Sequence, residues 1–226
     1  MKGSKMDATP RVKICCIGSL EEAWVAINHG ASALGLVSEM PSGPGVIAES
    51  LIAEVARRMP PFVSSVLLTS KRSPSEIIEQ HLRCGTNALQ ICDELDPHGL
   101  DEVARALPGV DIIRVIHVRS EGSIEEAETV APHVNAILLD SGSKGGSMVE
   151  LGGTGRTHDW DVSRRIVEAV GVPVILAGGL NPGNVAEAIK LVKPYAVDVC
   201  SGVRTGGRLD SEKLQSFMSR VRGSAQ

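Results

Sequence analysis

The chain has 226 residues, of which 42% are hydrophobic and 22% charged, and its formal net charge is −4. These values exclude an intrinsically disordered chain, and the mildly acidic balance offers no basic surface of the kind that binds nucleic acid. Aromatic residues make up only 2% of the chain, so the core must consist mainly of Val, Ile, Leu and Ala. No run approaches the ~20 apolar residues of a membrane-spanning helix. We therefore expect a soluble globular protein with no nucleic-acid or membrane partner.

Short, uniformly apolar runs recur along the chain, as is typical of parallel strands that are buried on both faces. The predicted strands are Val12–Ile17, Ala33–Val37, Phe62–Leu68, Ala88–Cys92, Ile112–Val118, Ala136–Asp140, Pro173–Ala177 and Ala196–Cys200. Helix-like segments lie between them, for example Leu20–His29, Ile77–Cys84, Asn184–Leu191 and Ser211–Val221. Ser19 and Gly30 are expected to cap the first of these helices, and Ser73 and Gly85 to bound the second.

Eight strands that alternate with eight helical segments average about 28 residues per unit, which is typical of a (β/α)8 TIM barrel. The main alternative is a doubly wound open sheet. Against it, the turn after the first strand, Cys15–Ser19, lacks the spaced glycines of a dinucleotide fingerprint. We expect a flexible N-terminal segment, residues 1–10, followed by a single α/β domain, the (β/α)8 barrel of residues 11–226.

Five cysteines occupy positions 15, 16, 84, 92 and 200. Their number is odd, and their spacing lacks the paired C-x-x-C rhythm of a structural zinc site. This favours a reducing compartment, with the thiols as small buried hydrophobic groups or, for one of them, as a reactive group. The polar N-terminus has no apolar run suited to a signal peptide, so a cytoplasmic location is expected.

Cys15 and Asp140 are candidate catalytic residues because each stands at the end of a predicted strand, where barrel enzymes keep their reacting groups. Alternation along an extended strand would send Cys15 and Cys16 to opposite faces, so that at most one points into the barrel mouth. Asp140 follows four apolar residues, where desolvation raises the pKa of a carboxyl as a general acid requires. The simpler alternatives are a buried apolar cysteine and a carboxylate that caps the next loop.

Other polar residues in the predicted strands suggest structural roles. Lys13 and Asp198 lie in apolar strands, and each is expected to pair with a polar group inside the barrel. His117 and His158 have no ligand partner four residues further on, so no metal site is expected.

Glycine-rich turns follow the last three predicted strands. Glycine lets the backbone approach an oxyanion closely, and consecutive N–H groups or a short helix N-terminus can hold a phosphate. The three turns together predict a phosphate site in the C-terminal βα loops. Its expected residues are Gly153, Thr154, Gly155, Gly178, Gly179, Ser201, Gly202 and Val203.

Several segments resemble the phosphoribosylanthranilate isomerase family, (β/α)8 enzymes of tryptophan biosynthesis. Residues 12–15 read V-K-I-C and resemble the family's opening V-K-I-C-G. Residues 30–37, G-A-S-A-L-G-L-V, are similar to its G-A-D-A-L-G-F-V, and residues 138–160 hold its L-L-D, G-G-T-G and D-W in order. Residues 176–185, L-A-G-G-L-N-P-G-N-V, and 198–203, D-V-C-S-G-V, resemble its L-A-G-G-L-N-P-x-N-V and D-V-S-S-G-V. The chain thus resembles a divergent member of the family along nearly its whole length.

The resemblance implies an Amadori rearrangement of a phosphorylated aminoaldose to an aminoketose. It implies that Asp140 is the acid that opens the furanose ring and that Cys15 is the base that removes the C2 proton. It requires no metal and no organic cofactor. The implied partner is a small phosphorylated sugar, and the chain would act as a monomer or homodimer.

Three departures from the family pattern bear on the substrate. Gly45 stands where the family's S-P-R-x-I loop has an arginine that helps to hold the anionic substrate. Cys92 replaces the histidine of V-Q-L-H-G, and Cys16 replaces the glycine that follows the catalytic cysteine. Candidates for the missing positive charge are Arg119, Lys144 and Arg204.

The departures leave two alternatives open, namely a related isomerase of another phosphorylated aminoaldose and a non-catalytic phosphoribosyl-binding protein. Residues 141–154 are glycine-rich and are expected to form a mobile segment over the site.

Overall fold

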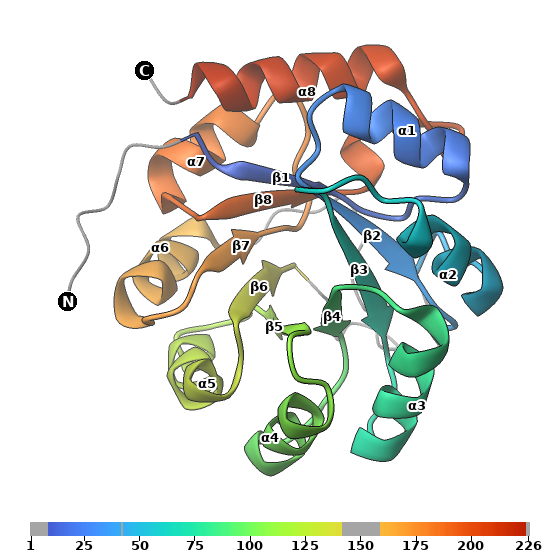
Figure 1. Cartoon of the computed structure of the whole chain (residues 1–226). Coiled ribbons are helices and arrows are strands. Elements are labelled where there is room, and N and C mark those ends of the chain that lie inside the picture. Colours follow the sequence, from blue (N-terminus) through green and yellow to red (C-terminus); the bar gives the residue numbers. More distant parts are fainter. Residues whose placement is uncertain (1–8, 42, 142–158, 225–226) are drawn as a thin grey trace.

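The computed structural model describes residues 9–41, 43–141 and 159–224. Eight parallel strands form one closed barrel in chain order, and the last strand pairs with the first. Figure 1 shows this barrel with the helices arranged around it. The strands are β1 (Arg11–Ile14), β2 (Ala33–Val37), β3 (Ser64–Thr69), β4 (Ala88–Ile91), β5 (Asp111–His117), β6 (Ala136–Asp140), β7 (Val174–Leu176) and β8 (Ala196–Val199). The closed sheet confirms the predicted (β/α)8 barrel and excludes the open sheet.

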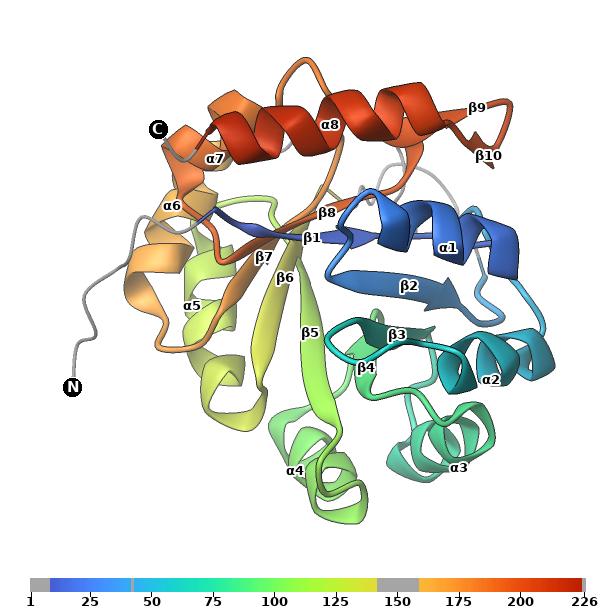
Figure 2. The same cartoon turned by 45° about the horizontal axis from the view of Figure 1, so that its top comes forward.

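A helix follows each strand of the barrel. The helices are α1 (Leu20–Asn28), α2 (Glu49–Arg57), α3 (Pro74–Cys84), α4 (Pro97–Ala106), α5 (Gly122–Val130), α6 (Trp160–Ala169), α7 (Val185–Val192) and α8 (Ser211–Gly223). Short 3-10 turns, η1 (Ala131–His133) and η2 (Ser201–Val203), follow α5 and β8. A small hairpin of β9 (Arg204–Thr205) and β10 (Arg208–Leu209) joins η2 to α8, as Figure 2 shows. Within the described ranges, no helix has the length and apolar character needed to cross a bilayer.

The predicted helix boundaries follow from local capping. The Ser19 Oγ accepts a hydrogen bond from the Glu22 N–H at the start of α1, at 3.2 Å. Gly85 ends α3 with φ +64°, a left-handed conformation that glycine adopts without strain. The Asp159 carboxylate caps α6 by accepting hydrogen bonds from the N–H groups of Asp161 and Val162, the second and third residues of that helix.

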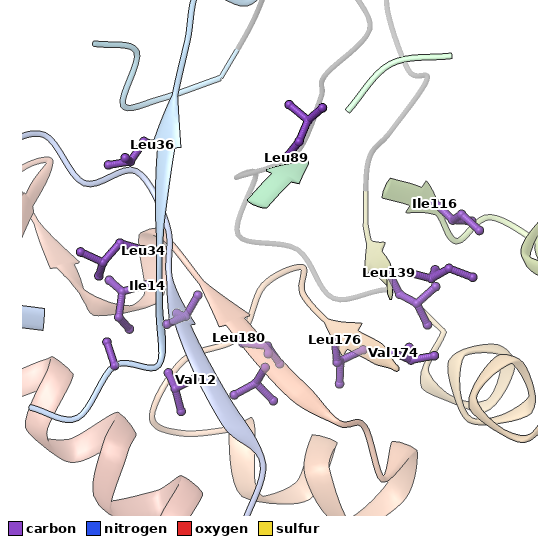
Figure 3. Packing of buried hydrophobic residues seen from close by; sticks show 14 of the residues in the cluster. Val12, Ile14, Leu34, Leu36, Leu89, Ile116, Leu139, Val174, Leu176 and Leu180 are labelled. Atoms are coloured by element: carbon purple, nitrogen blue, oxygen red, sulfur yellow. The ribbon is translucent and has the colours of Figure 1, made fainter. Parts of the chain in front are cut away.

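Buried apolar side chains form two clusters on the two sides of the barrel wall. The larger cluster joins the outward-facing strand residues to the helices, and Figure 3 shows part of it around Ile14, Leu34 and Leu176. The smaller cluster fills the barrel itself and includes Val66 and Leu138. Because successive residues of a strand face opposite sides, the predicted apolar runs fill both clusters.

The third strand differs from its predicted limits. Phe62 was expected to begin that strand, but β3 begins at Ser64, and the Phe62 side chain is fully exposed. Its φ is +70°, which takes the chain out of the extended conformation. The apolar character of Phe62 therefore gave the wrong boundary at this point.

Gly202 fits only because it has no side chain. A Cβ at this position would lie 2.0 Å from the Leu180 carbonyl oxygen, which follows β7. We expect Gly202→Ala to destabilise the protein by about 1–3 kcal/mol through this overlap. Gly171→Ala is the control, because a Cβ there meets no atom within 4 Å. Thermal unfolding of both variants tests the contact, and equal midpoints would contradict it.

Candidate active site

A cavity opens at the carboxyl ends of the barrel strands. Its wall takes residues from the ends of β1 to β4 and β6 to β8, among them Cys15, Gln90 and Asp140. Both predicted catalytic residues therefore line the same cavity. The barrel order puts two strands, β7 and β8, between β6 and β1 on the short side, so Cys15 and Asp140 enter the cavity from well-separated parts of the wall.

Cys15 directly follows β1 and is 6% exposed. Its N–H donates a hydrogen bond to the Val199 carbonyl at 2.9 Å, which fixes the backbone against β8. Gly35 in β2 leaves the space that the Cys15 thiol occupies, since a Cβ on Gly35 would lie 2.8 Å from its Sγ. The same Cβ would lie 3.1 Å from the Lys13 Nζ. The Cys15 thiol and the Lys13 ammonium are thus close neighbours beside Gly35.

Asp140 is the last residue of β6 and is 8% exposed. One carboxylate oxygen accepts a hydrogen bond from the Ser141 N–H at 2.7 Å. Burial raises the pKa of the Asp140 carboxyl above its ordinary value, despite the opposing effects of this hydrogen bond and of Lys13. The carboxyl is therefore suited to hold a proton that it can donate to a bound molecule.

Lys13 and Asp198 form a buried ion pair in the barrel, with 3.0 Å between Nζ and Oδ1. This confirms the prediction that each residue pairs inside the barrel. Burial disfavours the charge of Lys13, but the Asp198 carboxylate outweighs this effect and, with Cys15, raises the pKa of the lysine. The lysine is therefore a permanent cation inside the barrel.

Cys16 also lines the cavity, so the prediction that Cys15 and Cys16 face opposite sides is wrong. The alternation argument fails because β1 ends at Ile14 and Cys16 has φ +62°. This left-handed conformation costs a non-glycine residue about 1–2 kcal/mol. The family motif V-K-I-C-G has a glycine at the position of Cys16. That glycine could have indicated a left-handed turn directly after the strand.

Gly45 packs directly against Cys16. A Cβ on Gly45 would lie 2.5 Å from the Cys16 Cβ, and Gly45 has φ +80°. A side chain at position 45 therefore cannot coexist with the present position of Cys16. Two of the positions at which the motifs of this chain differ from the quoted family motifs, 16 and 45, are therefore in direct contact.

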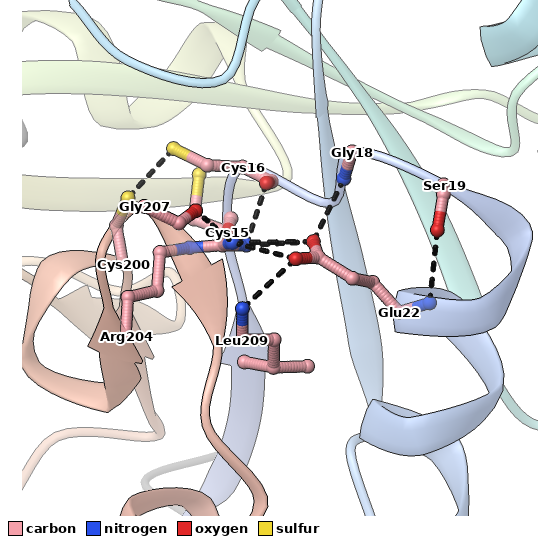
Figure 4. A network of polar contacts seen from close by, with 9 residues as sticks. All are labelled: Cys15, Cys16, Gly18, Ser19, Glu22, Cys200, Arg204, Gly207 and Leu209. Atoms are coloured by element: carbon pink, nitrogen blue, oxygen red, sulfur yellow. Dashed lines mark hydrogen bonds and ion pairs between the residues drawn. The ribbon is translucent and has the colours of Figure 1, made fainter.

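The guanidinium of Arg204 is occupied by hydrogen bonds and an ion pair within the protein. Figure 4 shows its guanidinium between Glu22 and the backbone that follows β1. Nη1 lies 3.0 Å from Glu22 Oε1, and Nη2 donates to the carbonyls of Cys15 and Cys16 at 3.2 and 2.6 Å. Glu22 also accepts hydrogen bonds from the N–H groups of Gly18 and Leu209. This clamp, which the sequence did not predict, removes Arg204 from the candidates that might hold a substrate carboxylate.

Arg119 and Lys144 are the two other candidates for the missing positive charge. Arg119 is exposed, and its backbone N–H donates to the Ser123 Oγ at 3.2 Å. Lys144 lies outside the described residues, as do residues 142–154 of the expected mobile segment.

Of the predicted phosphate-binding residues, Gly178, Gly179 and Ser201 line the cavity. Gly178 and Gly179 both have positive φ, and a Cβ on Gly178 would lie 2.8 Å from the Ser141 nitrogen. Gly202 and Val203 belong to η2 just behind the wall, and the Val203 side chain is fully buried. Gly153, Thr154 and Gly155 lie outside the described residues.

Gln90 of β4 is a cavity residue that the sequence did not single out. It is 4% exposed, and within the described part of the chain its Oε1 has no hydrogen-bond partner. Its Nε2 lies 3.6 Å from the Sγ of Cys92, the residue that replaces the family's histidine. A buried amide with an unused acceptor can bind a hydroxyl or N–H group of a ligand. Nowhere in the described ranges do three His, Cys, Asp or Glu residues form a group that could hold a metal ion.

Comparison with known proteins gives a consistent result. Residues 12–220 match the family model described as N-(5'-phosphoribosyl)anthranilate isomerase. The protein of that name from Methanocella arvoryzae is 40% identical over 94% of this chain and 98% of its own length. The one from Methanopyrus kandleri is 40% identical over 92% of this chain and 96% of its own.

Solved structures agree with the family model. The phosphoribosylanthranilate isomerase of Thermotoga maritima is 31% identical, with a TM-score of 0.81 over 95% of this chain and 99% of its own. Another such isomerase was solved with reduced 1-(o-carboxyphenylamino)-1-deoxyribulose 5-phosphate, at 29% identity and a TM-score of 0.79 over the same shares of the two chains. The chain belongs to the phosphoribosylanthranilate isomerase family.

Proposed function

We propose that this chain isomerises N-(5'-phosphoribosyl)anthranilate in tryptophan biosynthesis, with Asp140 as the acid and Cys15 as the base. The observation that carries the assignment of these roles is that both groups line one cavity at the carboxyl ends of the strands. Membership of the family, and the carboxyphenylamino deoxyribulose phosphate bound in a related isomerase, support the substrate.

In the proposed reaction, two proton transfers that involve Asp140 and Cys15 precede a final tautomerisation. The Asp140 carboxyl donates its proton to the furanose ring oxygen while the C1–O bond breaks, which leaves an iminium ion at C1. The Cys15 thiolate then removes the proton from C2, and the electron pair of that C–H bond forms the enolamine. Tautomerisation of the enolamine gives the aminoketose. Since these steps move only protons, the mechanism involves no redox cofactor.

The phosphate of the substrate is proposed to bind at the turns after β7 and β8. Positive φ at Gly178 and Gly179 supports a close approach of the backbone, and Ser201 begins η2 on the same wall. The N–H groups of Gly202 and Val203, together with Gly153, Thr154 and Gly155 beyond the described residues, complete the proposed site.

A second candidate is a related isomerase of another phosphorylated aminoaldose, which the packing of Gly45 against Cys16 favours. Turnover of N-(5'-phosphoribosyl)anthranilate by the purified protein separates the two. Conversion at rates that sustain a tryptophan auxotroph supports the first candidate, and binding of the same compound without conversion would contradict it.

The proposed roles predict that Cys15→Ala and Asp140→Asn each lower kcat by about 10²–10⁴-fold, the range for losing a general acid or base. Both variants should keep the wild-type far-ultraviolet circular dichroism. Cys84→Ala is the matched control, because this buried thiol lies in α3 outside the cavity. Near-normal turnover by either site variant would contradict its role.

The raised pKa of Asp140 predicts that this proposed catalytic group lowers the stability of the native state near neutral pH. Because folding raises this pKa, the ionised carboxyl destabilises the native state at pH values above its unfolded pKa of about 3.9. Asp140→Asn should therefore raise Tm near neutral pH, and the gain should shrink as the pH falls toward that value. Asp111→Asn, at an exposed carboxyl, serves as the control. A gain that is independent of pH would contradict this account.

The contact between Gly45 and Cys16 predicts strong coupling between these positions. Gly45→Arg alone should lower Tm and kcat/KM, because its Cβ overlaps the Cys16 Cβ. In the Cys16→Gly background the same change should cost less, with a coupling free energy of about 0.5–3 kcal/mol. Additive effects in the double-mutant cycle would show that the two residues do not exclude each other.

A further inference from the structure

Two of the chain's departures from the quoted motifs meet at one point. Cys16 stands where V-K-I-C-G has glycine, and Cys200 stands where D-V-S-S-G-V has its first serine. The two residues are 184 positions apart in the chain, and the pairing of β1 with β8 brings them together. Figure 4 shows their sulfur atoms facing each other beside Cys15.

The two thiols are in direct contact, with 2.7 Å between their Sγ atoms. A disulfide requires about 2.05 Å, so closing the bond needs a movement of less than about 1 Å. The backbone on both sides is already held. The Cys15 N–H is bonded to the Val199 carbonyl at 2.9 Å, and Arg204 holds the Cys16 carbonyl at 2.6 Å.

The Cys200 thiol is also accessible from the cavity, while Cys16 beside it is buried at 7% exposure. Cys16 and Cys200 both line its wall, and Cys200 is partly exposed. Cys84 and Cys92, by contrast, are buried at 1% and 4% exposure. A small reagent that enters the cavity therefore meets Cys200 without unfolding the barrel.

The surroundings of the two thiols shift their pKa values in opposite directions. Hydrogen bonds to Cys15 and Cys200, together with burial, raise the pKa of Cys16 well above its usual range. The hydrogen bond with Cys16, helped by the charge of Arg204, lowers the pKa of Cys200. Cys200 is also the more exposed of the two thiols. Because the thiolate is the reacting form, Cys200 is the expected nucleophile, and Cys16 is the thiol expected to react in the second step.

We propose that Cys16 and Cys200 form a dithiol modification site at the rim of the cavity, which small organic disulfides convert to an intramolecular disulfide. In the first step the Cys200 thiolate attacks one sulfur of the small disulfide, and one thiolate leaves. In the second step Cys16 attacks the Cys200 sulfur and expels the other thiolate. The two protons of the protein thiols pass to the two leaving thiolates, so one small disulfide is reduced to two thiols. The inference does not depend on the substrate proposed above.

The test is to treat the reduced, full-length protein with glutathione disulfide and then to alkylate it under denaturing conditions. Before alkylation, we expect the mass of the protein to be lower by two hydrogens. After alkylation, three of its five cysteines should carry the label, and peptide mapping should show a disulfide between Cys16 and Cys200. Dithiothreitol should restore all five thiols. A bridge that includes Cys15, or the absence of any bridge, would overturn the proposal.

Two variants test the order of the steps. Cys16→Gly suits the left-handed backbone at that position, and it should retain glutathione on Cys200 because the second thiol is missing. Cys200→Ser should form no bridge and no adduct on Cys16. Cys84→Ala should behave like the wild type. Bridge formation in either pair variant, or a glutathione adduct on Cys16 in Cys200→Ser, would contradict the assignment.

Discussion

The register between β1 and β8 closes the barrel, and the candidate site depends on it. In this register Lys13 lies opposite Asp198, and their side chains form the buried ion pair. Breaking one partner of such a pair leaves an uncompensated charge, at a cost of about 3–5 kcal/mol, so a slip of the register is strongly disfavoured. The same register brings Cys15 and Cys16 beside Cys200, and it allows Arg204 to hold the backbone after β1. The position of the proposed base thus follows from closure of the barrel.

Much of the fold could be predicted because parallel strands buried on both faces leave a strong apolar signal in the sequence. The positions of Asp140 and Cys15 in the cavity could also be predicted, since a residue at the end of such a run lies at the carboxyl edge of the barrel. Two features of the site could not be predicted from the sequence. Cys16 turns with a positive φ that its residue type does not suggest, and the link between Arg204 and Glu22 joins residues that only the closed barrel brings together.

Cys16, Cys200 and Gly45 form one compact region of the structure. Cys16 contacts Cys200 on one side and excludes a side chain at Gly45 on the other. Substrate chemistry and thiol chemistry therefore share one cavity but depend on different residues, and each can be altered by substitution without changing the other's reacting groups.

In the proposed reaction, one bound molecule contacts both the Cys15 thiol and the Asp140 carboxyl. A crystal structure of this protein with reduced 1-(o-carboxyphenylamino)-1-deoxyribulose 5-phosphate tests it most directly. We expect the C2 atom of this ligand to lie beside the Cys15 Sγ, its sugar oxygens to face Asp140, and its phosphate to bind at the turns that contain Gly178 and Ser201. A ligand that contacts only one of the two groups, or whose phosphate lies elsewhere, would contradict the proposed roles of Cys15 and Asp140.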